Sequence, residues 1–426
     1  MRPEPAAQLA ALRIVVPTMI LATPEVRHAA ALAAVPAALR VAPEGLGWFV
    51  AWVPVHPVVA GVVQAIAVFS ALCAIAGLRA RVALAVLTGS AFYLFALSQL
   101  SGAVWHDMHL LWMSALLAAS PCDEAWAFDR CGEPAPADSE RYGWALGMAR
   151  LQLAAVYFFP GLHKLLTSGL AWALSDNLRN QLWWKWAEHG AVPAFRVDHH
   201  PALLTAAALF VLGFELSFPV LALVPRTRAV AAVAGLAFHL CAAFFLRIPF
   251  VSLWATYVVL VDPRRLVPRW WRRPPAASVA APPPLRSTVV VGAALFAAIV
   301  VQGLRGQTRA FPFACYPTFE WMAPTVMPDL EIEAETADGR AVLLPHARDA
   351  HGYRTQRQWG EIWSLAGATS PVDPARLRAY LDWTARTEPA RSIVAGATRI
   401  RFYRVYRAVV PEQRGWPPVA RVEITP

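Results

Sequence analysis

The sequence YFFPGLHKLL at residues 157–166 lies near the end of an apolar run that begins around Leu151. It places His163 and Lys164 side by side where this run meets the edge of a membrane. Within a hundred residues in either direction, the only other lysine is Lys185. Ionisable side chains inside membrane-spanning segments are costly and are usually functional. This stretch therefore predicts both a membrane fold and a candidate site.

The composition of the whole chain agrees with a membrane fold. Of 426 residues, 57% are hydrophobic and 15% are charged, and the mean hydropathy is +0.43. A soluble enzyme with an ordinary solvated surface is not this apolar, so a polytopic membrane protein is predicted. The net charge of +10 comes almost wholly from arginines in short loops between apolar runs. That pattern indicates membrane orientation, and we expect no nucleic-acid partner.

The apolar runs predict a mainly α fold, a polytopic bundle of about nine transmembrane helices, since several runs approach the 20 residues that cross the hydrocarbon. The runs lie roughly at residues 8–24, 57–78, 80–100, 105–120, 144–166, 201–223, 228–246, 248–262 and 287–303. The fourth and the eighth are short, so they are expected to pack inside the bundle. A small extracytoplasmic α+β domain, mostly β, is expected to follow the last helix.

Arginines in three connecting segments predict the orientation. They follow the second, sixth and eighth runs, at Arg79, Arg81, Arg226, Arg228, Arg264, Arg265, Arg269, Arg272 and Arg273. With nine crossings all three segments fall on one side of the membrane, which the excess of positive charge identifies as the cytoplasm. We therefore expect a multi-pass protein of a bacterial-type inner (plasma) membrane, with a cytoplasmic amino terminus.

Four domains follow from this reading. They are a transmembrane domain at 1–265, a cytoplasmic Arg/Pro-rich linker at 266–286, a last transmembrane helix at 287–303 and an extracytoplasmic soluble domain at 304–426. In the soluble domain, strands are predicted by LEIEAET (330–336), AVLLP (341–345) and TRIRFYRVYRAVV (398–410), and a helix starting near Asp373 by DPARLRAYLDWTART (373–387).

The outer segment 167–200 is rich in tryptophan. It contains Trp172, Trp183, Trp184 and Trp186, a density typical of an interfacial belt. We expect this segment to lie flat on the outer leaflet, below the soluble domain.

Several ionisable side chains interrupt the apolar runs: Arg13, His106, His109, His163, Lys164, Glu215, His239 and Arg247. Tyr157, Gly161 and Lys164 share one helix face. A desolvated lysine at Lys164 could serve as a base near neutral pH. Alternatively, Lys164 snorkels to the outer headgroups, and Glu215 forms a structural ion pair with Arg13.

Histidine spacing raises the question of a metal. His106 and His109 stand one helical turn apart, and His199 and His200 form a pair in the outer loop. Membrane di-iron oxidases use many more histidines than these, grouped in repeated clusters. No metal is predicted.

The stretch QLAAVYFFPGLHKLLTSGLAW (152–172) resembles the vitamin K-dependent γ-carboxylase family, whose membrane part is also called the HTTM domain. There, a Tyr-Phe pair and small residues precede the lysine that is the family's catalytic base. The resemblance gives this role to Lys164. Pro160 stands where that family usually has alanine, and His163 where the carboxylase has another lysine.

Four further stretches are similar to the family in the same order, so the resemblance covers roughly residues 8–262. They are AALRIVVPTMIL (10–21), WHDMHLLWMSALLAASPCDEAWAFD (105–129), GFELSFPVLALVPRTR (213–228) and FHLCAAFFLRIPFVSLW (238–254). They place Arg13, His106, Glu215 and His239 on family positions. The family's asparagine before the histidine is absent here. A slip of one turn would select His109 in place of His106.

The resemblance implies an integral membrane lyase that uses a reduced quinone like vitamin K hydroquinone, O2 and CO2. Lys164 would deprotonate the hydroquinone, and the anion would take up oxygen to become an alkoxide base. That base would remove a C–H proton from the substrate, to which CO2 adds. A dry site is needed. Lys164 and His106 are the predicted catalytic residues, and the predicted substrate- or cofactor-binding residues are His109, Arg13, Tyr157, His163, His239 and Glu215.

The expected partners are membrane lipid, the quinone and a peptide substrate containing glutamate, although another peptide or a small molecule also fits. The alternative is a transport or assembly protein that keeps the HTTM fold without the reaction. The missing asparagine and Pro160 favour that alternative. If there is an active site, Lys164 should line a pocket with at least one of His106, His239 and Arg13. This pocket should have an apolar lateral mouth and a more polar outer mouth.

Overall fold

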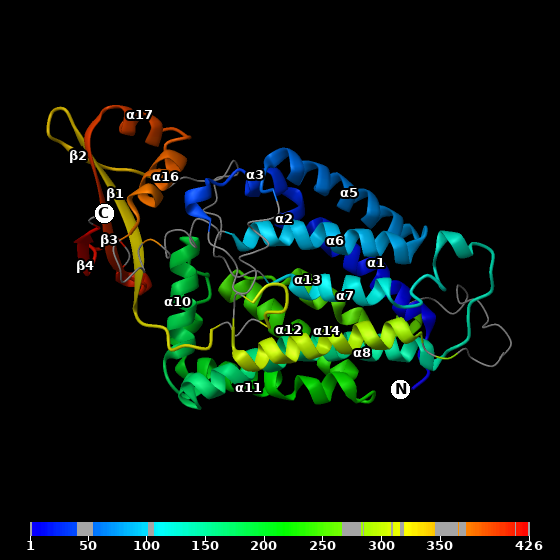
Figure 1. Cartoon of the computed structure of the whole chain (residues 1–426). Helices are drawn as coiled ribbons and strands as arrows, with labels where there is room; N and C mark the ends of the chain where they lie inside the picture. Colours follow the sequence, from blue (N-terminus) through cyan, green and yellow to red (C-terminus); the bar gives the residue numbers. More distant parts are fainter. Residues whose placement is uncertain are drawn as a thin grey trace.

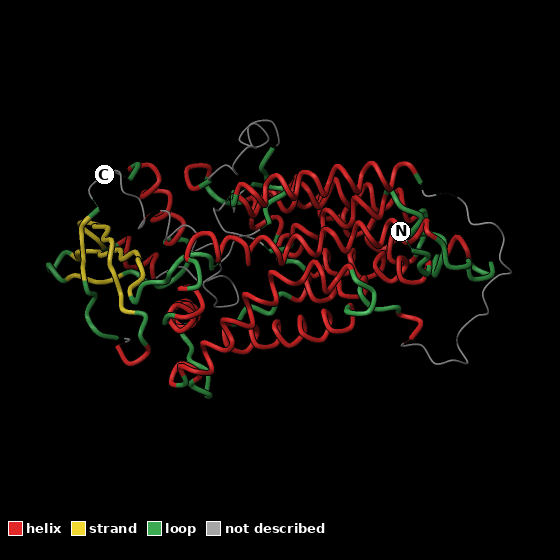
Figure 2. The backbone as a smooth tube through the Cα atoms, turned by 90° about the horizontal axis from the view of Figure 1, so that it is seen from below, coloured by secondary structure: helices red, strands yellow, loops and turns green. Residues whose placement is uncertain are grey.

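In the computed structural model, long apolar helices form an elongated bundle, and a small sheet domain lies beyond one end of it (Figure 1). Seen from below, most helices run along the long axis, while the strands are confined to the far end (Figure 2). The structure describes residues 2–40, 54–100, 106–265, 283, 285–307, 310–315, 319–345, 365, 372–413 and 415–424. The predicted linker at 266–286 lies almost wholly outside these residues.

Six helices in the described residues are long and apolar enough to cross a membrane. They are α5 (Pro57–Ala76), α6 (Ala80–Gln99), α8 (Glu140–Ser168), α11 (Pro201–Leu223), α12 (Arg228–Cys241, extended by a π-helical turn, Ala242–Leu246) and α14 (Arg286–Arg305). Two other apolar helices, α1 (Ala6–Ala22) and α7 (Met108–Ala118), are shorter. As predicted for the fourth run, α7 packs inside the bundle, with most of its side chains buried.

Six of the nine predicted spanning runs thus have this length and hydropathy within the described residues. The eighth run, 248–262, is not one helix but a short helix, α13 (Val251–Ala255), followed by a 3-10 turn (Thr256–Val259). Just before α13, Arg247 and Phe250 have left-handed backbones, with φ of 58° and 45°, on either side of Pro249. Residues in this conformation cannot continue a right-handed helix. Hydropathy alone does not show such a break.

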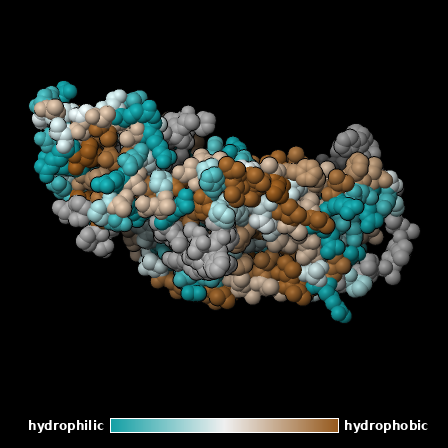
Figure 3. Space-filling view, turned by 45° about the horizontal axis from the view of Figure 1, so that its top comes forward, coloured by the Kyte–Doolittle hydropathy of each residue, from teal (hydrophilic) through white to brown (hydrophobic). Residues whose placement is uncertain are grey.

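The remaining helical pieces connect the bundle. They are α2 (Pro24–Arg27), α3 (Ala29–Ala33), α9 (Ala171–Leu174), α10 (Asn177–His189) and 3-10 turns at Ala37–Leu39, Phe128–Arg130, Val197–His199 and Pro263–Arg265. The face of the bundle seen in Figure 3 is largely apolar along its middle, whereas polar residues gather at the end remote from the sheet domain and over the sheet domain itself. This distribution fits a protein whose middle faces lipid.

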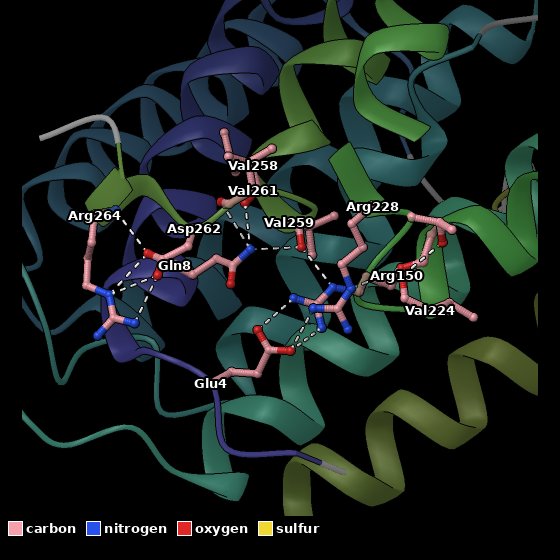
Figure 4. Close-up of polar contacts among 12 residues, drawn as sticks. Glu4, Gln8, Arg150, Val224, Arg228, Val258, Val259, Val261, Asp262 and Arg264 are labelled. Atoms are coloured by element: carbon pink, nitrogen blue, oxygen red, sulfur yellow. Dashed lines mark hydrogen bonds and ion pairs between the residues drawn. The ribbon is translucent and has the colours of Figure 1, made fainter. Parts of the chain in front are cut away.

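Polar contacts tie the amino terminus to neighbouring helices (Figure 4). They lie at the end of the bundle that is remote from the sheet domain (Figure 1). The Glu4 carboxylate accepts hydrogen bonds from Arg150 and Arg228 at 2.8–3.0 Å. The Gln8 amide donates to the carbonyl groups of Val258, Val259 and Val261 at 2.9–3.1 Å. The amino terminus and the turn with Arg228 thus share one end of the bundle. Which side of the membrane this end faces stays a prediction.

The C-terminal domain is an antiparallel four-stranded sheet in the order β2-β1-β3-β4. Its strands are β1 (Val326–Thr336), β2 (Ala341–Leu343), β3 (Ala397–Ala408) and β4 (Ala420–Glu423), and its helices are α16 (Pro374–Thr384) and α17 (Ala390–Ala395). Alternate residues of β1 are buried toward α16, while the glutamates between them pair with arginines of β3 and β4. The three predicted strands and the predicted helix are confirmed, with Asp373 as its N-cap. β4 and α17 were not predicted.

Candidate functional site

The centre of the site is an ion pair between α8 and α11. Lys164 Nζ lies 2.8 Å and 2.9 Å from the two carboxylate oxygens of Glu215, and the two side chains are only 4% and 7% exposed. Close packing at Gly161 permits this contact, since a Cβ there would lie 2.8 Å from the Glu215 Cβ. Lys164 is thus buried against Glu215, and the alternative that it snorkels to the headgroups is wrong.

The alternative that Glu215 forms an ion pair with Arg13 is also wrong. Arg13 is fully buried on α1, where its guanidinium donates to the carbonyl groups of Cys122, Ala125 and Trp126 at 2.6–3.3 Å. These carbonyls follow α7 in the chain. Arg13 therefore fixes a loop after α7 and does not line the cavity described next.

A cavity of about 110 Å³ lies beside the ion pair, far larger than one water molecule requires. Most of its wall is apolar or aromatic, including Val156, Pro160, Phe238 and Phe250. Its polar lining consists of Lys164, Glu215, His106, Tyr157, His239 and Gln181. The cavity thus combines five of the eight predicted site residues.

The floor of the cavity holds a chain of hydrogen bonds. The Tyr157 hydroxyl lies 2.5 Å from Nε2 of His239 and also bonds to the hydroxyl of Tyr257. His239 is 1% exposed, and its Nδ1 has no hydrogen-bond partner among the described residues. The sequence does not identify Tyr257 as a site residue. Its one indication is that a tyrosine interrupts the apolar run 248–262.

The neighbouring histidines separate into different environments. The His106 ring lines the cavity and packs edge-on to Phe250, with ring centres 4.9 Å apart. His109 is fully buried, and its Nδ1 donates to the His106 carbonyl at 3.0 Å. His163 Nε2 donates to the Gly303 carbonyl of α14 at 2.7 Å. The structure thus places His106 at the cavity, while His109 and His163 are not part of its lining.

Trp172, Gln181 and Phe319 also line the cavity. Phe319 belongs to the strap, our name for residues 319–324, which links the bundle to β1. Side chains of α8–α10 bond to the strap backbone: Trp172 to Phe319, Ser168 to Glu320, Gln181 to Trp321, Asn180 to Ala323 and Trp184 to Pro324, at 2.6–3.0 Å. The strap therefore has a fixed position over the cavity.

The tryptophans of segment 167–200 do not form the predicted interfacial belt. α10 crosses the end of the bundle between the helices and the sheet domain, as expected for the outer segment (Figure 1). However, Trp172, Trp184 and Trp186 are 2%, 9% and 0% exposed, and each indole donates to a backbone carbonyl. They form internal packing and not an interfacial belt, because their apolar rings are covered by the strap and by the end of α12.

Two carboxyl groups near this outer end were not predicted from sequence. Burial raises the pKa of Glu320, and the nearby His163 and Lys164 offset that effect only in part. Burial, together with the charge of Asp107, raises the pKa of Glu25 to about 8. No group of three or more His, Cys, Asp or Glu side chains that could hold a metal ion occurs within the described residues.

Comparison with known proteins identifies one domain. The HTTM domain model matches residues 1–263, which includes every residue of the ion pair and the histidine–tyrosine chain. No curated protein and no solved structure shows significant similarity to the chain. The HTTM domain is shared by vitamin K γ-carboxylase and by other proteins, so the match defines a family and leaves the reaction open.

Proposed function

Because the chain belongs to the HTTM domain family, we propose that it is a multi-pass membrane enzyme of the γ-carboxylase type. Its co-substrates would be a reduced quinone, O2 and CO2. The observation that supports this proposal is a buried lysine–glutamate pair on the wall of a mostly apolar cavity. Buried ionisable groups in membrane bundles commonly mark functional sites.

The donor set of the cavity fits a hydroquinone-like ring. Aromatic and aliphatic side chains would cover its faces, while Lys164–Glu215 and the histidines would contact its oxygens. When bound, the reduced quinone would supply an acidic hydroxyl and the reducing power to form a base strong enough to remove a C–H proton. The long tail of such a molecule can stay in the lipid, so it can enter from the side.

The protein's own part is to accept and hold a proton at Lys164 Nζ. As an ion pair, the ammonium already holds its proton, so it must first pass one to Glu215. In a water-poor cavity a neutral amine–carboxylic acid pair avoids the desolvation cost of two charges. The neutral Nζ then accepts the hydroxyl proton. The ring of Trp172, with its centre 5.3 Å from Nζ, favours the resulting ammonium.

The other groups would orient the ligand and exclude water. His106 and His239 lie on the same wall and can donate to developing oxyanions. Trp172 and Phe319, which also line the cavity, would help to shield a strong base from water. A polar substrate, such as a glutamate-containing peptide, would approach from the sheet-domain end. We place that end outside the cytoplasmic membrane of a bacterial-type cell.

Oxygen consumption tests the proposal. Purified protein in lipid nanodiscs, supplied with 2-methyl-1,4-naphthohydroquinone, should consume oxygen faster than the Lys164→Ala variant, which controls for spontaneous oxidation. We expect Lys164→Ala to lose the activity at near-normal expression, and His106→Ala to lose less. Lys185→Ala, which removes the chain's other lysine, should retain activity. A Lys164→Ala variant with full activity would refute the proposal, and a larger loss in His109→Ala than in His106→Ala would give His109 the catalytic role.

One observation favours a second function. Both carboxylate oxygens of Glu215 contact Lys164 Nζ. A buried ion pair of this kind can specify how helices pack without taking part in a reaction. The protein would then be a transport or assembly factor that retains the HTTM fold. In that case naphthohydroquinone would cause no oxygen consumption above the Lys164→Ala control, whereas loss of the pair would still lower stability.

A further inference from the structure

The backbone between α12 and α13 leaves the regular helical conformation three times beside the cavity. A π-helical turn (Ala242–Leu246) follows α12, and Arg247 and Phe250 then have left-handed backbones. Ala242, Leu246 and Phe250 line the cavity. π-helical turns are frequent at functional sites, and a bulky residue keeps a left-handed backbone only where its surroundings require it. The contacts of Phe250 therefore indicate what this segment does.

The ring of Phe250 contacts both of the histidines that line the cavity. Its centre lies 4.9 Å from the centre of the His106 ring and 5.6 Å from that of the His239 ring, at interplanar angles of 73° and 58°. The two histidines come from different parts of the chain, since His106 precedes α7 and His239 lies on α12. Phe250 is therefore a packing partner that the two rings share, and a movement of its ring would affect both.

A hydrogen bond joins the chain neighbours of these residues. The Ser252 hydroxyl donates to the carboxylate of Asp107. Asp107 follows His106 directly and is the N-cap of α7, while Ser252 lies in the first turn of α13, whose N-cap is Phe250. The bond thus ties the start of α7 to the start of α13. It holds His106 beside Phe250 at the place where the left-handed backbone would otherwise tend to relax.

We propose that Phe250 is a positioning residue whose ring sets the placement of His106 and His239 on the cavity wall, and that the hydrogen bond from Ser252 to Asp107 holds it there. A group that stabilises developing charge is effective only within a narrow range of positions. Loss of the Phe250 ring should therefore weaken the contribution of both histidines at once. This consequence rests on the proposed function, whereas the placement of the rings can be measured without it.

Solid-state NMR of the full-length protein in nanodiscs, with ¹³C- and ¹⁵N-labelled histidine and no ligand, tests the placement. The ring signals of His106 and His239 are assigned by their loss in His106→Gln and His239→Gln. Each ring should give one sharp set of signals in the unsubstituted protein. Phe250→Leu keeps an apolar side chain on the same backbone and should split or broaden both sets. Ser252→Ala should do the same to the His106 set, whereas Ser252→Thr, which keeps the hydroxyl, should not.

The control for loss of an aromatic ring is Phe244→Leu. Phe244 lies in the same segment, is 54% exposed and does not line the cavity, so both sets should stay sharp. A Phe250 that only stabilises the fold would lower the unfolding temperature and leave the signals of the folded protein single. Sharp signals from either histidine in Phe250→Leu would overturn the shared placement. Sharp His106 signals in Ser252→Ala would overturn the role of the hydrogen bond, and this variant decides if Phe250→Leu does not fold.

Oxygen consumption with 2-methyl-1,4-naphthohydroquinone tests whether Phe250 acts through the histidines. Phe250→Leu should lower kcat by roughly tenfold or more and change KM less, because positioning matters most in the transition state. The same substitution should cost less in a His106→Ala background, where one of the positioned rings is already absent. Equal losses in the two backgrounds would show that Phe250 does not act through His106 and would refute the proposal. Lack of any Lys164-dependent oxygen consumption would refute the proposed function and leave the NMR results unchanged.

Discussion

Lys164 and Glu215, 51 residues apart in the chain, form a buried ion pair in which Nζ contacts both carboxylate oxygens. Removing one partner leaves the other charge buried without compensation. We expect Glu215→Gln to lower the free energy of unfolding by about 3–5 kcal/mol, whereas the double variant Lys164→Met/Glu215→Leu should recover most of it. Thermal unfolding in nanodiscs measures both. If the double variant lost the sum of the single losses, the two side chains would not be coupled.

Gly161 lets α8 and α11 approach each other at this pair. A Cβ there would lie 2.8 Å from the Glu215 Cβ and 3.3 Å from the Leu216 amide nitrogen, so the helices must move apart. We expect Gly161→Ala to destabilise the protein by about 1–3 kcal/mol and to reduce any Lys164-dependent oxygen consumption. Gly213→Ala on α11 is the matched control, since nothing lies within 4 Å of its Cβ position. Equal losses in the two variants would contradict this close approach.

Burial of Glu25 predicts that the protein loses stability as the pH rises from about 4.5 to about 8. It is 1% exposed, and burial and the charge of Asp107 raise its pKa from 4.5 to about 8. When the pKa of a carboxyl group is higher in the folded state than in the unfolded state, the group stabilises the folded state. This stabilisation is fully present at a pH below the pKa of the unfolded state. That contribution is lost as the pH rises from about 4.5 through 8. Unfolding temperatures over this range should decline less in Glu25→Gln than in the unsubstituted protein. Glu133→Gln, at an exposed site, should leave the decline unchanged.

The strap should become more mobile when the hydrogen bond from Trp184 to its backbone is removed. The Trp184 indole donates to the Pro324 carbonyl at 2.6 Å, and the ring packs edge-on to Trp321. Trp184→Phe keeps an aromatic ring and removes the donor, so the Ala323 amide, which bonds to Asn177 at 2.9 Å, should exchange its hydrogen faster. Mass spectrometry of peptides covering 319–325 measures this exchange. Trp416→Phe, at a 60% exposed site, is the control, and identical exchange in both variants would show that the strap is held by other contacts.

Membrane orientation can be measured at the two ends of the bundle. Cys131 is exposed in the loop after α7, on the side of the amino terminus, and Val419 is 67% exposed in the sheet domain. We expect a membrane-impermeant maleimide to label Val419→Cys, in a Cys131→Ser background, on intact cells. The native Cys131 should react only after the cells are permeabilised. Labelling of both positions from the same side would disprove the predicted topology.

The sequence by itself determined the class of the protein. Hydropathy and run length identified the long helices, because transfer of each segment into lipid depends on its own residues. The residue patterns likewise predicted the strands β1 and β3. The resemblance over residues 8–262 selected the side chains that the cavity combines, namely Lys164, Glu215, His106, Tyr157 and His239.

Only the tertiary structure decided how these side chains pair. Glu215 contacts Lys164 and not Arg13, and Tyr157 meets Tyr257 a hundred positions away in the chain. His106 faces the cavity, while His163 turns toward α14 although it adjoins Lys164 in sequence. Such contacts depend on how helices rotate and approach one another, at Gly161 and Gly235 above all. Local hydropathy carries no information about rotation, because each helix is apolar on nearly every face.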